Sequence, residues 1–152
     1  MKENRERAIN SVITMEGGFA ERENEPGGAC NMGVSLQVFR EEYPGATVEE
    51  LKNMTREQAV FIYGRRFANP IGFDEQPSGY DLALLHCAVM FGVSGAVNVF
   101  DFQAKGDLGL LCLLMMFNKM HRKIEDWHFM AGWANRIKAV YEMAKPLTEG
   151  QV

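Results

Sequence analysis

The chain has 152 residues, the usual size of one domain, and is long enough to bury a hydrophobic core. Hydrophobic residues make up 47% of the sequence and charged residues 24%, which excludes an intrinsically disordered protein. The net charge of −4 argues against general nucleic-acid binding, because that function normally requires a basic excess.

The N-terminal segment predicts a helix that ends at an acid. Apolar residues recur at helical spacing between about residues 3 and 16, and Gly17 and Gly18 supply the open backbone that ends a helix. The charged start, MKENRERAIN, has no apolar core, so we expect no signal peptide. Residues 19–33 lack a helical period and are rich in glycine, which predicts a loop or a short β-hairpin.

The middle of the chain predicts short helices with recognisable starts. One helix is expected from about Ser35 to the residues before Pro44. Two capping boxes follow, in which a threonine stands three residues ahead of Glu or Gln: Thr47 with Glu50, and Thr55 with Gln58. They predict helices near residues 48–53 and 56–67.

The second half of the chain predicts longer and more apolar helices. Residues 80–91 are apolar on nearly every side, which is typical of a helix at the centre of an α domain. Gly92 ends it, and Ser94 is expected to cap a helix that reaches about residue 103. Two more helices are predicted at about residues 108–126 and 131–145. The apolar run that opens the first of them is too short to span a bilayer.

Glu16 stands where the first helix is predicted to end. The helix dipole makes that end negative, so a partly buried acid placed there should keep its proton to higher pH than a free glutamic acid. This placement costs stability but suits a general acid that must be protonated near neutrality. The alternative is an exposed helix-end residue that water screens.

The loop after Glu16 supplies further acids. Glu21, Glu23 and Glu25 are candidate second carboxylates, and the glycines let the backbone fold back toward the helix end. Glycosidic cleavage uses two carboxylates, because one protonates the leaving oxygen while the other activates water or stabilises the positive sugar. An acid-rich loop is more often only a solvated one, so these residues alone leave a glycosidase as one hypothesis.

The stretch MEGGFAERENEPGGACNMGVS, residues 15–35, resembles the signature of glycoside hydrolase family 108, lysozyme-like N-acetylmuramidases of phages and bacteria. That signature reads roughly E-G-G-Y, a short acidic stretch, then P-G-G-x-T-N-x-G-[IV]-[ST]. Similarity continues in TREQAVFIYGRRFANPIGFDEQPSGYDLALLHCAVMFGVSGAV and in GWANRI. The resemblance implies a mainly α, lysozyme-like domain that cleaves the β-1,4 bond between N-acetylmuramic acid and N-acetylglucosamine in peptidoglycan, without a cofactor.

The resemblance also implies roles for individual residues. Glu16 takes the position of the general acid. Glu25 is the candidate that activates water or stabilises the oxocarbenium-like state, and Cys30 stands where a threonine is common. The candidate substrate-binding residues are Gly17, Gly28, Asn31 and Tyr80.

Two of these positions depart from the commoner residue types. Glu25 is a methylene longer than aspartate, which extends its carboxylate by about 1.5 Å. The Cys30 thiol holds a water or a sugar hydroxyl more weakly than a threonine hydroxyl does. We therefore keep two hypotheses: Cys30 only lowers the rate, or the protein has lost hydrolysis and binds peptidoglycan or assists secretion or lysis.

By resemblance, residues 1–152 form one lysozyme-like domain. About residues 1–104 would be the catalytic core, and about residues 105–147 would be C-terminal helices packed on it. The expected partner is the peptidoglycan glycan strand, with no nucleic acid and no stable membrane insertion. The protein would be cytoplasmic on synthesis and would reach the wall through a phage holin or another non-standard route, as an endolysin does.

Other sites remain as weaker hypotheses. Cys30, Cys87 and Cys112 form no CxxC pair, which fits a reducing compartment, and the cysteines and histidines lack zinc-ligand spacing. A cysteine hydrolase would need Cys30 and His86 to meet in space. The Met-rich stretch LLMMFNKM can serve as a partner surface, although such a stripe is more often core.

Overall fold

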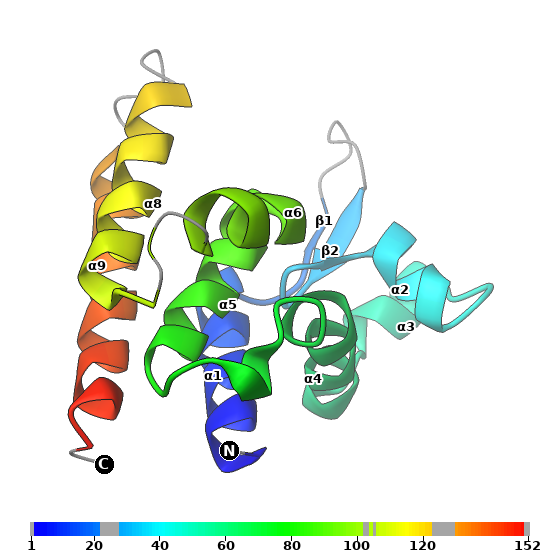
Figure 1. Ribbon diagram of the computed structural model, residues 1–152. Helices are drawn as coiled ribbons and strands as arrows, with labels where there is room; N and C mark the ends of the chain where they lie inside the picture. Colours follow the sequence, from blue (N-terminus) through cyan, green and yellow to red (C-terminus); the bar gives the residue numbers. More distant parts are fainter. Residues whose placement is uncertain (1, 22–27, 102–103, 105, 123–129, 151–152) are drawn as a thin grey trace. The chain divides into compact units, whose positions relative to one another are not determined.

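The computed structural model describes residues 2–21, 28–101, 104, 106–122 and 130–150 (Figure 1). The chain divides into two compact units: one is Glu6–Arg66, and the other is Met1–Arg5 together with Phe67–Val152. Helices predominate, and a small antiparallel sheet follows the first helix, so the predicted mainly α fold is confirmed.

The unit Glu6–Arg66 contains most of the first helix, the sheet and three short helices. Its elements are α1 (Lys2–Glu16), β1 (Ala20–Glu21), β2 (Ala29–Asn31), β3 (Val34–Ser35), α2 (Leu36–Glu42), α3 (Val48–Lys52) and α4 (Arg56–Tyr63). The strands are antiparallel in the order β1-β2-β3, with Cys30 opposite both Ala20 and Ser35. The predicted loop or hairpin after the first helix is therefore a three-stranded sheet.

Local side-chain hydrogen bonds fix where the short helices begin. Thr47 and Glu50 form a complete capping box at α3, and Thr55 and Gln58 form another at α4, as the sequence predicts. Ser35 caps α2, because its hydroxyl accepts a hydrogen bond from the Val38 amide at 3.3 Å. These side chains satisfy backbone donors that the first turn of a helix leaves without partners.

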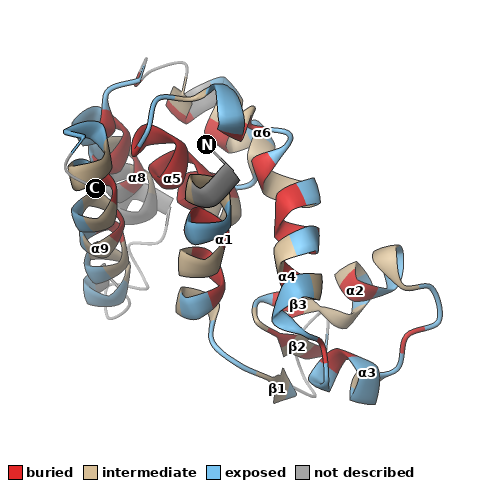
Figure 2. Ribbon diagram, turned by 90° about the horizontal axis from the view of Figure 1, so that it is seen from below, coloured by how far each residue is buried: buried red, intermediate tan, exposed pale blue. Residues whose placement is uncertain are grey.

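The second unit is built around a buried helix, α5 (Tyr80–Phe91). Its residues from Tyr80 to Ala88 are all buried, which Figure 2 shows as an almost continuous band. Two long helices pack against each other and against α5: α8 (Leu108–Arg122) and α9 (Met130–Thr148) (Figure 1). The predicted central helix is thus confirmed.

The helix after α5 differs from the prediction in how it begins. α6 (Val93–Gly95) starts directly after Gly92, whose φ of +83° makes the turn, and continues as a π-helical segment, Ala96–Asp101. Ser94 is therefore inside the helix and does not cap it. Its hydroxyl instead accepts a hydrogen bond from the Asn98 amide at 3.2 Å.

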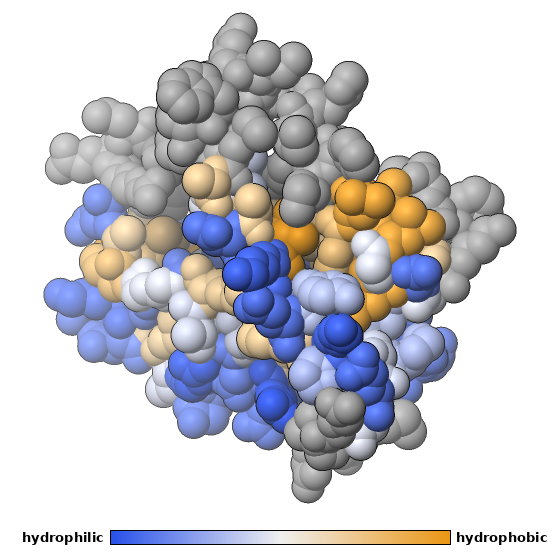
Figure 3. Space-filling view, turned by 90° about the vertical axis from the view of Figure 1, so that its left-hand side faces the viewer, coloured by the Kyte–Doolittle hydropathy of each residue, from blue (hydrophilic) through white to orange (hydrophobic). Residues whose placement is uncertain are grey.

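α8 places apolar side chains on the surface. Leu110 is 39% exposed and Leu113 is 48% exposed. Figure 3 shows hydrophobic residues gathered on one part of the face that it draws. None of the described helices combines the length and the hydropathy that crossing a membrane requires.

Candidate active site

Glu16 is the last residue of α1 and is half-buried. Gly17 follows with a φ of +85°, a left-handed conformation that glycine adopts without strain, and the helix ends there as predicted. The chain then turns into the sheet through Phe19, whose ring lies 5.9 Å from the ammonium of Lys52 at the end of α3. This cation–π distance ties the segment after Glu16 to α3.

A two-residue turn joins β2 to β3. Asn31 and Val34 are Cα partners, so Met32 and Gly33 form the whole connection. Their φ angles are +48° and +76°, the combination of signs that a type I′ hairpin turn requires. The sequence NMGV therefore folds back on itself in the shortest common hairpin.

This turn lies directly on the side chain of Glu16. A Cβ atom added to Gly33 would lie 2.8 Å from Cγ of Glu16 and 2.9 Å from its Cβ. Both distances are shorter than the closest approach of two carbon atoms that are not bonded to each other. The same added atom would also collide with the hydroxyl of Tyr63, from α4. Glycine at position 33 is thus required twice, by its backbone conformation and by the space that Glu16 and Tyr63 occupy.

Cys30 and Asn31 point to opposite faces of the sheet, because neighbouring side chains of a strand alternate. Cys30 is on the partly exposed face, whereas Asn31 is only 4% exposed. The Asn31 amide donates hydrogen bonds to the backbone carbonyls of Leu51 at 2.9 Å and Lys52 at 3.0 Å. The structure therefore directs Asn31 to the end of α3, where it satisfies two helix carbonyls.

The remaining predicted site residues lie in different surroundings. Gly17 and Gly28 are exposed, and Gly28 also has a positive φ, +60°. Glu25 lies outside the described residues. Tyr80 is 1% exposed at the start of α5, and its hydroxyl donates a hydrogen bond to Asp101 at 2.8 Å. Burial and the neighbouring Asp101 raise the pKa of the Tyr80 hydroxyl, so it stays protonated.

The zinc hypothesis and the reactivity of the buried thiols can be examined within the described part of the chain. No three acid, cysteine or histidine side chains there are close enough to hold a metal ion. Burial raises the pKa of the Cys112 thiol to about 11, and burial and Cys112 raise that of Cys87 as well. Both thiols therefore stay protonated and unreactive near neutral pH.

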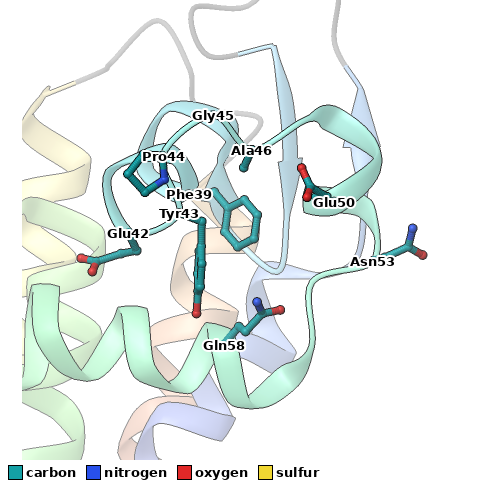
Figure 4. A pocket seen from close by; sticks show the side chains of 9 residues that line it. All are labelled: Phe39, Glu42, Tyr43, Pro44, Gly45, Ala46, Glu50, Asn53 and Gln58. Atoms are coloured by element: carbon teal, nitrogen blue, oxygen red, sulfur yellow. The ribbon is translucent and has the colours of Figure 1, made fainter.

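A cavity of about 560 Å³ opens elsewhere in the unit Glu6–Arg66. Figure 4 shows aromatic side chains of α2 and its end, a carboxylate of α3 and an amide of α4 around it. Four of its polar side chains have partners within the fold: Glu42 with Arg65, Glu50 with Thr47, Asn53 with Glu49, and Gln58 with Thr55. The cavity lies where α2, α3 and α4 meet.

Two residues beside Glu16 carry no role in the prediction from sequence. Gly33 matches a position of the family signature, but only the folded chain shows that it touches the acid. Tyr63 is 2% exposed and occupies the buried face of an amphipathic helix. Nothing in its local sequence distinguishes it from other core residues. Both contacts join segments that are distant in the sequence, which periodicity and capping patterns do not report.

The chain resembles known proteins at two levels. The profile of the family described as glycosyl hydrolase 108 matches residues 9–92, more than half of the chain. The solved structure of Brucella abortus SagA superposes with a TM-score of 0.80 over 97% of this chain and 97% of its own, at 24% sequence identity. No curated protein matches the chain.

The structural match establishes that this protein and SagA share a fold, and the family match covers Glu16, the hairpin turn and α4. The mainly helical architecture with its small antiparallel sheet is that of lysozyme-like domains. The chain belongs to glycosyl hydrolase family 108, a family of lysozyme-like glycosidases that hydrolyse peptidoglycan.

Proposed function

We propose that this protein is an N-acetylmuramidase that cleaves the β-1,4 bond between N-acetylmuramic acid and N-acetylglucosamine, with Glu16 as the general acid. The observation that carries the proposal is the placement of Glu16. It is half-buried at the end of α1, with the β2–β3 turn packed against its carbon stem. A carboxyl held in this way is partly shielded from water and still open to a ligand.

The chemistry at Glu16 follows from what a glycosidic bond requires. A protonated carboxyl donates its proton to the bridging oxygen as the bond to the anomeric carbon breaks, and positive charge develops on the sugar. A second carboxylate then stabilises that charge or activates a water, and Glu25 is our candidate. Cys30, which follows Glu25 in the signature, lies on the partly exposed face of β2, where a thiol can contact substrate.

The other candidate residues divide by their surroundings. Gly17 and Gly28 are exposed and carry no side chain, so they would contact sugar hydroxyl and acetamido groups only through their backbone. Asn31 and Tyr80 are buried and hydrogen-bonded to protein groups. We propose that these two support the site through the fold.

The test uses purified peptidoglycan with wild type and Glu16→Gln, and identifies the released fragments by mass spectrometry. We expect fragments with reducing N-acetylmuramic acid ends from the wild type. Glu16→Gln should release them at least about a hundredfold more slowly, since it cannot donate the proton. Fragments that end in reducing N-acetylglucosamine would contradict the proposed bond, and equal release by both proteins would contradict the role of Glu16.

A second candidate function is the binding of peptidoglycan without hydrolysis. The observation that favours it is the cysteine at position 30. A thiol is a weak hydrogen-bonding group where a hydroxyl is common. Cys30→Thr discriminates the two functions. Faster release by Cys30→Thr than by an active wild type would show that the thiol only limits the rate. Retained wall binding without release, for wild type and Cys30→Thr alike, would support the binding function.

The wider context stays a prediction. Action at the cell wall after release from the cytoplasm, through a holin or a secretion route, is the behaviour that we expect of such an enzyme. Its substrate in that setting would be the glycan strand of peptidoglycan.

A further inference from the structure

Tyr63 lies where α4 meets the hairpin turn. It is the last residue of α4 and is 2% exposed. Its hydroxyl donates a hydrogen bond to the backbone carbonyl of Met32 at 3.1 Å. The Tyr63 oxygen and the Cβ and Cγ atoms of Glu16 all lie within 3 Å of the point that a Cβ on Gly33 would occupy. The tyrosine, the turn and the acid therefore form one packed cluster.

The other end of α4 is fixed to α1. Arg56, the first residue of α4, donates hydrogen bonds to the Asn10 side chain at 2.6 Å and to the Thr14 hydroxyl at 3.2 Å. Asn10 and Thr14 are one helical turn apart and lie on the last part of α1 before Glu16. α4 thus contacts α1 through Arg56 at its start and reaches the Glu16 cluster through Tyr63 at its end.

The turn needs such support because its backbone is unfavourable. Met32 is a non-glycine residue at a positive φ of +48°, a conformation that side chains of its type rarely adopt. A hydrogen bond to the carbonyl of Met32 holds the peptide unit between Met32 and Gly33. That unit determines how closely Gly33 approaches the stem of Glu16.

We propose that Tyr63 is a positioning residue for the general acid. It holds the Met32–Gly33 turn against the stem of Glu16, and so fixes the direction of the carboxyl. The proposal rests on the proposed function of Glu16, and adds to it a residue that neither touches substrate nor carries the proton. A misplacement of about 1 Å costs a reaction about a hundredfold in rate, because the chemical step depends on the alignment of the reacting groups. Substrate affinity depends mainly on other contacts, so kcat should change more than KM.

The experiment compares the release of muropeptides by wild type, Tyr63→Phe and Gly33→Ala, with kcat and KM measured separately on solubilised peptidoglycan. Tyr63→Phe keeps the ring and its packing and removes only the hydroxyl. We expect its kcat to fall by about ten- to a hundredfold with little change in KM. Gly33→Ala should lose more, because its methyl group collides with both Tyr63 and Glu16.

Tyr43→Phe is the matched control. Tyr43 belongs to the same unit, is partly exposed, and packs against the ring of Phe39 at a centroid distance of 4.7 Å. Removing its hydroxyl should leave kcat unchanged. A loss of similar size in Tyr43→Phe and Tyr63→Phe would show a general effect of tyrosine hydroxyls on the fold and would overturn the proposal.

A double variant separates positioning from a purely structural role. If Tyr63 acts through the acid, Tyr63→Phe should slow the residual activity of Glu16→Gln by less than twofold, since the group that it positions is already absent. If the double variant loses the same factor as Tyr63→Phe alone, the proposal is wrong. An active wild type with normal kcat in Tyr63→Phe overturns this inference alone. An inactive wild type overturns the proposed function and this inference with it.

Discussion

Met32 occupies the position of the hairpin turn where Asn, Asp or Gly is the usual residue. Type I′ turns favour Asn-Gly because both central residues take a positive φ, and this chain has Met-Gly. The side chain of Met32 is half-exposed, so packing offers only part of a compensation. The unfavourable backbone conformation is confined to Met32, and the next residue, Gly33, packs against Glu16.

Met32→Asn should therefore stabilise the protein. Asparagine tolerates the left-handed conformation, and we expect the free energy of unfolding to rise by up to about 1 kcal/mol. Urea denaturation followed by circular dichroism measures the change. Met32→Leu is the control, because leucine keeps the conformational cost and should give no gain. A loss of stability in Met32→Asn would show that the packing of the methionine outweighs its strain.

Residue-scale reasoning from sequence placed Glu16 correctly at the end of its helix, with Gly17 ending it. Both features depend on neighbours in the chain, which sequence patterns report. Asn31 illustrates the limit: it is one residue from Cys30 and shares its strand, but strand alternation turns it toward α3. Which face of a two- or three-residue strand is buried depends on the element packed against it.

At the scale of elements, the two capping boxes show how far local chemistry goes. Each depends on residues three positions apart, and the structure confirms both. The π-helical segments Gly64–Ala68 and Ala96–Asp101 were not predicted. A π-helix changes the hydrogen-bond step without changing composition, so the same residues are compatible with an ordinary helix.

The capping box of α4 should contribute measurably to the free energy of unfolding. The Thr55 hydroxyl accepts from the Gln58 amide at 3.3 Å, and the Gln58 side chain accepts from the Thr55 amide at 2.8 Å. Thr55→Ala should lower the free energy of unfolding by about 1 kcal/mol, because it leaves a helix donor without its partner. Thr55→Ser keeps an acceptor oxygen and should lose much less in the same denaturation assay. Equal losses in both variants would contradict this account of the cap.

At the scale of the whole molecule, the candidate site and the most apolar helices belong to different compact units. Glu16, the hairpin turn and α4 belong to Glu6–Arg66, whereas α5, α8 and α9 form the apolar interior of the other unit. Reasoning from sequence instead places α5 with Glu16 in a core of about residues 1–104, and α8 and α9 among C-terminal helices of about residues 105–147. It did not find the boundary between the units near residue 66, because that boundary falls within the continuous helical run that α4 opens.

His86, in the buried helix α5, makes global stability depend on pH. Burial, and to a lesser extent Arg136, lower the pKa of His86 to about 3, below its ordinary value of about 6.5. Between these two pH values, His86 is protonated in the unfolded chain and neutral in the folded protein. The free energy of unfolding should fall as pH decreases from about 6.5 toward 3, and the His86 contribution is constant above that range.

His86→Gln tests this dependence, because glutamine does not titrate. Its unfolding free energy should fall less than that of the wild type over the same pH range, measured by urea denaturation at each pH. Burial also raises the pKa of Asp81, which acts in the opposite direction, and the difference between the two proteins removes that common contribution. Identical pH dependence in both proteins would contradict the assignment to His86.

The central claim is that Glu16 supplies the proton for glycosidic cleavage. The most direct measurement is the initial rate of muropeptide release from purified peptidoglycan by Glu16→Gln beside Glu6→Gln, a matched change at an exposed acid of the same helix. We predict a loss of at least about a hundredfold for Glu16→Gln and an unchanged rate for Glu6→Gln. Equal rates in the two variants, with both folded as the wild type is, would contradict the account.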